Sequence, residues 1–173
     1  MRNANSTKPT VDVLELLTAQ HAEVDALFEQ IENKRDDRAA AFADLANKLA
    51  AHATIEEKIF YPAVMAKQTN EMLHEAVEEH LEVKRVLADL LTMKMDEDTF
   101  DAKISVLKEN VSHHAHEEEE EKLFSLLRKQ MSSDELGALG NECLALFETL
   151  MDGTPSATVP SETKAAAPLP QVA

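Results

Sequence analysis

The chain is 173 residues long, which is enough for one domain with a hydrophobic core and for additional tails. Its net charge of −16 comes from 33 acidic and 17 basic side chains. Such a surface repels phosphate backbones and anionic lipids, so we expect neither a nucleic acid nor a membrane as a partner.

Composition also indicates the fold class and the compartment. The chain has three glycines and is rich in Ala, Leu, Glu and Lys, and no window alternates apolar and polar residues, so the sequence predicts an all-α protein. The single cysteine, Cys143, excludes an internal disulfide and a thiolate-rich metal site. The N-terminal MRNANSTKPT lacks the apolar core of a secretion signal, and no apolar run reaches transmembrane length. We therefore expect a cytoplasmic protein.

Four long amphipathic helices are predicted, at residues 11–34, 37–67, 70–93 and 99–131. Pro62 should kink or end the second of them. Ser132 and Glu135 are three residues apart and form a predicted capping box, which opens a short fifth helix that ends by Met151.

The connections between the four long helices are short, which favours antiparallel neighbours in an up-down-up-down four-helix bundle. We assign residues 11–151 to this bundle and residues 1–10 to a flexible N-terminus. Residues 152–173 are rich in Pro, Ala, Ser and Thr, a composition that buries little apolar area, so we expect a disordered C-terminal tail.

Each of the first three helices carries an apolar stripe with three- and four-residue steps, which should face the core. Each stripe is interrupted near its middle by a histidine: His21, His52 and His80. Glu56 lies one helical turn after His52 on the same face. A single core histidine is usually only hydrogen-bonded, but a buried carboxylate needs a cation or several donors, because burying it unpaired costs several kcal/mol.

The second helix has a near copy in the fourth. The segment HATIEEKIF begins at His52, and the segment HEEEEEKLF begins at His116. The shared pattern is His-x-x-x-Glu-Glu-Lys-Ile/Leu-Phe, which adds His116 and Glu120 to the candidate metal ligands. Glu/His sets on facing helices are the arrangement of carboxylate-bridged dimetal sites in helical bundles.

The fourth helix has two apolar registers that differ by one or two positions. Residues up to Val111 project forward to His114 and Glu118, whereas residues after Glu120 project back to His116. A π-bulge near Ser112–Ala115 would bring the two registers together. We choose His116 with Glu120 because of the repeat and keep His114 with Glu118 as the alternative.

Two further histidines have less defined roles. His113 is either a donor to a ligand or an additional ligand. His74 lies off the stripe of its helix and is interpreted as a surface residue.

These motifs, in this order, resemble the hemerythrin-like, HHE cation-binding family over about residues 11 to 131. The resemblance implies a non-haem diiron site in which Glu56 and Glu120 bridge two irons. His21 and His52 would hold one iron, and His80 and His116 the other, with manganese as the alternative metal.

One departure from the family bears on function. Oxygen-carrying hemerythrins have a further histidine one turn before the His80 position, where this chain has Ala76. Fewer protein ligands leave an open position, which suits binding of or reaction with dioxygen, peroxide or nitric oxide rather than oxygen transport. The resemblance therefore implies a role in stress response or iron handling.

The sequence does not separate an enzyme that processes peroxide or nitric oxide from a protein that supplies iron for cluster repair. A different class is an iron or oxygen sensor that acts through a protein partner. A metal-free helical interaction protein is disfavoured, because it would leave Glu56 and Glu120 without a cation.

Overall fold

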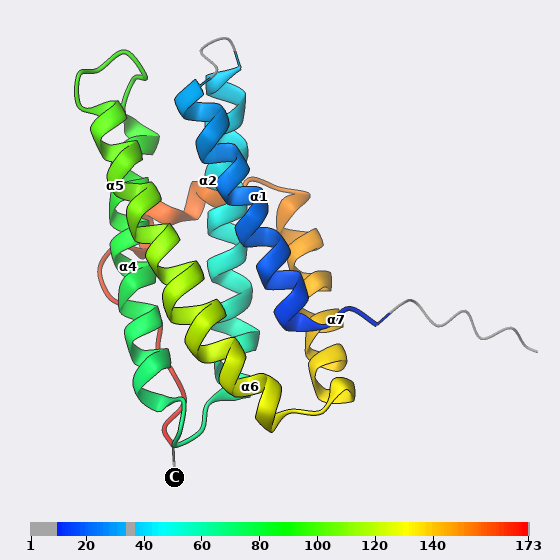
Figure 1. The fold of residues 1–173 in the computed structure, drawn as a ribbon. Coiled ribbons are helices and arrows are strands. Elements are labelled where there is room, and N and C mark those ends of the chain that lie inside the picture. Colours follow the sequence, from blue (N-terminus) through cyan, green and yellow to red (C-terminus); the bar gives the residue numbers. More distant parts are fainter. Residues whose placement is uncertain (1–9, 34–36, 173) are drawn as a thin grey trace, which may run out of the picture.

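The computed structural model describes residues 10–33 and 37–172. In this part of the chain every regular element is a helix, which confirms the all-α prediction. Helix α1 spans Val13–Asn33, α4 spans Asn70–Thr92 and α7 spans Ser133–Met151. The long helical segments lie side by side, and consecutive segments run in opposite directions (Figure 1).

Two of the long segments are composite. The second begins as α2 (Arg38–Ile55), continues as the π-helix η1 (Glu56–Phe60) and ends with α3 (Tyr61–Val64), so it stops soon after Pro62. The fourth begins as α5 (Phe100–Ser112), continues as the π-helix η2 (His113–Phe124) and ends with α6 (Ser125–Gln130). The start of η2 confirms the predicted departure from α-helical geometry near residues 112–115.

Local hydrogen bonds explain where two helices begin. The Asp12 carboxylate accepts the backbone N–H groups of Leu14 and Glu15 at 2.8 and 3.2 Å and so satisfies donors in the first turn of α1. At α7 the predicted capping box is confirmed, because the Ser132 hydroxyl accepts the Glu135 N–H and the Glu135 carboxylate accepts the Ser132 N–H.

Helix α7 packs unusually close to the segment that precedes α1. A Cβ placed on Gly140 would lie 1.8 Å from the carbonyl oxygen of Val11. The absence of a side chain at this position allows the two backbones to approach each other.

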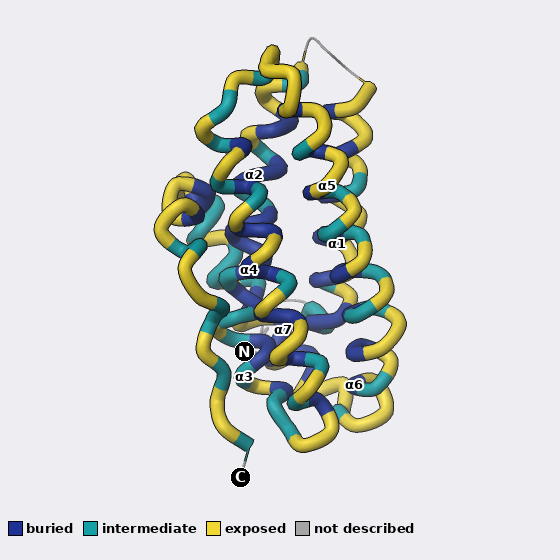
Figure 2. The backbone as a smooth tube through the Cα atoms, turned by 90° about the vertical axis from the view of Figure 1, so that its left-hand side faces the viewer, coloured by how far each residue is buried: buried dark blue, intermediate teal, exposed yellow. Residues whose placement is uncertain are grey.

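Buried residues face the space between the helices (Figure 2) and form two apolar clusters. One cluster includes Phe28, Phe42, Leu87, Phe100 and Leu107, and the other includes Leu14, Leu17, Phe60, Leu73 and Leu127. The four buried histidines of the long helical segments come between these clusters in sequence, as His21 does between Leu17 and Val24. A polar layer therefore lies within an apolar interior.

The expected disorder of residues 152–173 is not confirmed. Residues Pro155–Glu162 form the 3₁₀-helix η3, and Val159 on it is only 1% exposed and belongs to the first apolar cluster. The Ser156 hydroxyl donates to Asn47 Oδ1 at 2.8 Å. Composition alone did not reveal that one valine of this segment fits against the core. Among the described residues, no helix combines the length and hydropathy needed to cross a bilayer.

Candidate metal centre

Two groups of potential metal ligands share one carboxylate in the polar layer. The first consists of His21 on α1, His52 on α2, Glu56 at the start of η1 and Glu119 on η2; the second consists of Glu56, His80 on α4 and His114 on η2. Within each group, one ligand atom per residue lies within 4.8 Å of all the others. All six residues are buried, and Glu56 is completely so.

The four imidazoles have the same orientation relative to the layer. Each places its Nδ1 against an oxygen outside the two groups, at 2.6 to 3.1 Å; the four pairs are His21 with Glu120, His52 with Gln20, His80 with Glu57 and His114 with Glu79. An Nδ1–H that donates to such an oxygen leaves Nε2 with a free lone pair. This is the usual arrangement of histidines that bind metals.

Five of the atoms that face inward lack hydrogen-bond partners. Nε2 of His21, Nε2 of His52, both carboxylate oxygens of Glu56 and Oε2 of Glu119 are buried without a hydrogen bond in the described part of the chain. They are nevertheless close together: His52 Nε2 lies 3.2 Å from Glu56 Oε1, and His21 Nε2 lies 3.2 Å from Glu119 Oε2. Buried polar atoms are rarely left unsatisfied, so this donor set fits a bound cation.

The same carboxylates shift the proton affinity of the imidazoles. Burial alone lowers the pKa of His21, but its close contact with Glu119 and the charges of Glu119 and Glu56 raise it to about 9. Burial likewise lowers the pKa of His80, while Glu56 and Glu57 raise it to about 10. Burial raises the pKa of Glu56, but His52 and His80 hold it well below its ordinary value. The layer thus attracts positive charge.

The family of the chain follows from its sequence. The sequence profile of the hemerythrin HHE cation binding domain matches residues 12–127. The chain belongs to this family. The match includes all six clustered residues, so the candidate metal centre lies within the family's HHE domain.

Two similar proteins can be compared with this chain. A crystal structure of a hemerythrin HHE cation binding domain-containing protein from Mycobacterium kansasii superimposes with a TM-score of 0.74 at 23% identity and covers 88% of this chain and 99% of that one. A DNA nickase from Nostoc sp. is 26% identical over 132 residues, which are 75% of this chain and 37% of the relative. The HHE chain thus matches little more than a third of that relative's length.

The structure brings together four of the residues that the sequence singled out, namely His21, His52, Glu56 and His80. It does not bring His116 or Glu120 into either group. His116 is 37% exposed and lies 2.9 Å from Asp25, and Glu120 accepts the Nδ1–H of His21 at 2.7 Å. Both residues therefore lie at the edge of the candidate centre, outside the two groups of potential ligands.

The π-helical geometry of η2 explains this difference. In a π-helix the hydrogen bonds join residues five apart, so a turn brings residues i and i+5 onto one face. His114 and Glu119 have this spacing and face the layer, whereas the repeat suggested the four-residue spacing of His116 and Glu120. Of the alternative pair, His114 lies in the second group, whereas Glu118 forms an ion pair with Lys122 at 2.6 Å.

Tyr61 is a residue of the centre that the sequence analysis missed. Its side chain is completely buried, and its hydroxyl donates to Glu119 Oε1 at 2.9 Å and lies 3.3 Å from His80 Nε2. Burial raises the pKa of Tyr61 well above its ordinary value, and the charges of Glu119 and Glu56 add to the effect. The only trace of this position in the sequence is that Tyr61 follows Glu56 by five residues. In the structure the Tyr61 N–H bonds to the Glu56 carbonyl across η1, which places the two residues on neighbouring turns.

A small cavity lies inside the protein next to the candidate metal centre. This cavity of about 30 Å³ is lined by all four clustered histidines, by Asp25, and by Val24, Leu49, Ala53, Val83, Val111 and Ala115. It has room for about one or two water-sized molecules.

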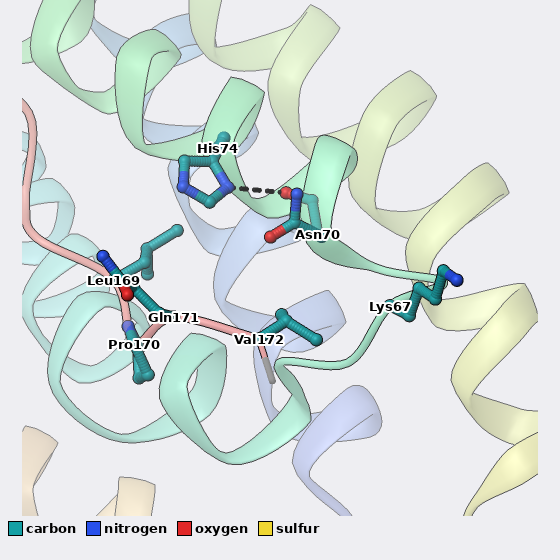
Figure 3. Close-up of a pocket in the computed structure, with 7 residues that line it drawn as sticks. All are labelled: Lys67, Asn70, His74, Leu169, Pro170, Gln171 and Val172. Atoms are coloured by element: carbon teal, nitrogen blue, oxygen red, sulfur yellow. Dashed lines mark hydrogen bonds between the residues drawn. The ribbon is translucent and has the colours of Figure 1, made fainter.

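A surface pocket of about 520 Å³ lies between the start of α4 and residues 169–172 (Figure 3). It contains none of the clustered residues, and its histidine, His74, is exposed and bonds to the Asn70 carbonyl at 2.8 Å. The interpretation of His74 as a surface residue is therefore confirmed. His113 is also at the surface, 48% exposed beside Glu117.

Proposed function

We propose that this HHE protein binds two iron ions in its polar layer, with Glu56 as a ligand shared by both. One ion would be held by His21, His52, Glu56 and Glu119, and the other by Glu56, His80 and His114. These residues would line the core of an up-down-up-down four-helix bundle, and manganese is the alternative metal.

The observation that carries this proposal is the contrast between the two sides of the ligand residues. On the outer side, every clustered imidazole has an oxygen acceptor for its Nδ1–H. On the inner side, five nitrogen and oxygen atoms are buried without a hydrogen bond in the described structure. Imidazole and carboxylate ligands suit iron or manganese better than soft metals.

The surroundings support reaction with, or binding of, a small oxidant such as dioxygen, peroxide or nitric oxide. Bound iron would supply the redox chemistry. The adjoining cavity of about 30 Å³ is mainly apolar, so it admits a molecule of two or a few atoms and excludes organic substrates of ordinary size. The hydroxyl of Tyr61 holds one oxygen of Glu119 and leaves the other directed at His21.

We place this activity in the cytoplasm, in stress response or iron handling. The DNA-nicking activity named for the Nostoc relative is not part of the proposal. That relative is far longer, and the net charge of −16 opposes the approach of a phosphate backbone.

Metal analysis after anaerobic reconstitution tests the proposal. We expect about two irons per chain, because six ligand residues, one of them a shared carboxylate, form two groups. Stopped-flow absorption with dioxygen, hydrogen peroxide and nitric oxide then separates turnover, expected of an enzyme, from a stable spectral change, expected of a sensor. At most one tightly bound iron would contradict the dinuclear centre.

A further inference from the structure

The C-terminal segment, residues 155–172, is attached to the rest of the chain beside the metal centre. Its helix η3 packs on α2 and α4 and inserts Val159, which is 1% exposed, into the first apolar cluster. The carbonyl of Thr163 accepts a hydrogen bond from Arg85 Nε at 3.2 Å. In Figure 1, η3 crosses the long helices part-way along their length.

A row of charged side chains joins this segment to a clustered histidine. Glu162 lies 3.0 Å from Lys84 Nζ. Lys84 Nζ donates to both oxygens of Glu57, at 2.7 and 2.9 Å, and Glu57 Oε1 lies 3.1 Å from His80 Nδ1. Lys84 is 8% exposed, so its ammonium group contacts these two carboxylates in place of most of the water.

The row affects the orientation of one imidazole. Glu57 can accept the Nδ1–H of His80 only while its carboxylate stays at this position, and Lys84 holds both of its oxygens. Four side chains accept from the Nδ1 atoms of the clustered histidines. In the described structure, Glu57 is the one of these four that a lysine, Lys84, connects to the segment after α7.

We propose that Glu162 and Lys84 are positioning residues that act through Glu57 to hold His80 in its metal-binding orientation. The C-terminal segment is then part of the second ligand group although it supplies no ligand. This inference rests on the proposed function, and it predicts that loosening the row weakens the ion at His80 and His114 while the ion at His21 and His52 stays bound.

The test compares single variants of the full-length, metal-loaded protein. Residues that hydrogen-bond to metal ligands typically contribute about 10- to 100-fold to metal affinity. We therefore expect Lys84→Met to speed the release of one ion to a chelator about tenfold, and Glu162→Gln to speed it a few-fold. Because Glu162 is on the surface, its variant should keep the fold if Lys84→Met does not. Matched controls are Lys103→Met, which removes an exposed pair with Asp89, and Glu148→Gln on the exposed side of α7.

Two further measurements identify the ion and the residue. In a His80→Ala background, Lys84→Met should add nothing to the release rate, since interacting residues are not additive. In the metal-free protein, the ¹⁵N shift of His80 Nδ1 should move in Glu162→Gln and not in Glu148→Gln.

The outcomes separate the two proposals. Equal release of both ions, or variants that behave like their controls while the parent chain holds two irons, would overturn the role of the row and leave the proposed function standing. A parent chain that fails to hold two irons would overturn the proposed function itself.

Discussion

Glu119 and Glu120 are neighbours in the chain, but their carboxylates have different surroundings. Glu119 is 1% exposed and faces His21 Nε2, whereas Glu120 is 26% exposed and bonds to His21 Nδ1. The first faces the centre of the polar layer, and the second supports a ligand from outside. One step along η2 thus changes the role of a glutamate.

We predict that Glu119→Gln lowers iron content from about two towards one per chain. The amide keeps the shape of the side chain but removes the negative charge that compensates a buried metal cation. His114→Ala should do the same to the second group. Iron per chain by elemental analysis is the measurement.

The controls lie on the same helix. Glu118→Gln breaks contacts with Lys122 and His113, which lie outside the two groups, so it should leave iron content unchanged. Glu120→Gln keeps an oxygen acceptor for His21 and should have a small effect. If Glu120→Gln and His116→Ala lose iron while Glu119→Gln and His114→Ala keep it, the repeat in the sequence was the better guide.

How much of the centre was predictable depends on which helices carry its residues. His21 and His80 lie on uninterrupted α-helices, and Glu56 follows His52 by one turn across the end of α2, so a period of 3.6 residues placed all four on the buried faces. The departure near His113 was predicted, but a single inserted residue was assumed. The structure continues it through Phe124, and within that span α-helical spacing no longer indicates which residues share a face.

At the scale of elements, the contact between α7 and the start of α1 depends on one missing side chain. We predict that Gly140→Ala destabilises the protein by about 1 to 3 kcal/mol, the usual cost of overpacking. The new Cβ would meet the backbone at Val11, which cannot rotate away, although alanine is the better helix former. Urea denaturation measures the change.

Gly153→Ala is the matched control, because its Cβ would lie 3.5 Å from the Leu150 carbonyl, an ordinary contact distance. Its free energy of unfolding should change by less than that of Gly140→Ala. Equal stability of the Gly140→Ala variant and the parent chain would show that α7 can move away from Val11.

At the scale of the whole molecule, an acidic chain concentrates its most buried charges in one internal layer. Glu56 and Glu119 are 0% and 1% exposed, and the described chain offers them imidazoles but no Lys or Arg as partners. Without a metal, protons on the imidazoles supply the compensating charge, as the raised pKa values of His21 and His80 show. Metal ions and protons therefore compete for the same layer.

This competition gives a pH dependence with a definite sign. The pKa values of His21 and His80 in the folded, metal-free protein are about 9 and 10, above the ordinary value of 6.5. Their contribution to stability is complete below about pH 6.5 and is lost as the pH rises towards 9 and 10. The free energy of unfolding of the metal-free protein should therefore fall between pH 6.5 and 8.5, by an amount on the order of a few kcal/mol.

Urea denaturation of metal-free and cobalt-loaded protein at pH 6.5, 7.5 and 8.5 tests this prediction. Cobalt(II) serves as an air-stable stand-in for iron, and because it replaces the protons, the loaded protein should lose less stability over this range. The range ends below pH 9, where ionisation of Cys143 in the unfolded chain begins to contribute, since burial raises its pKa to about 12 in the folded state. A His74→Gln control removes an exposed histidine and should keep the fall. A metal-free protein whose stability is constant or rises from pH 6.5 to 8.5 would show that protons do not replace the cation in this layer.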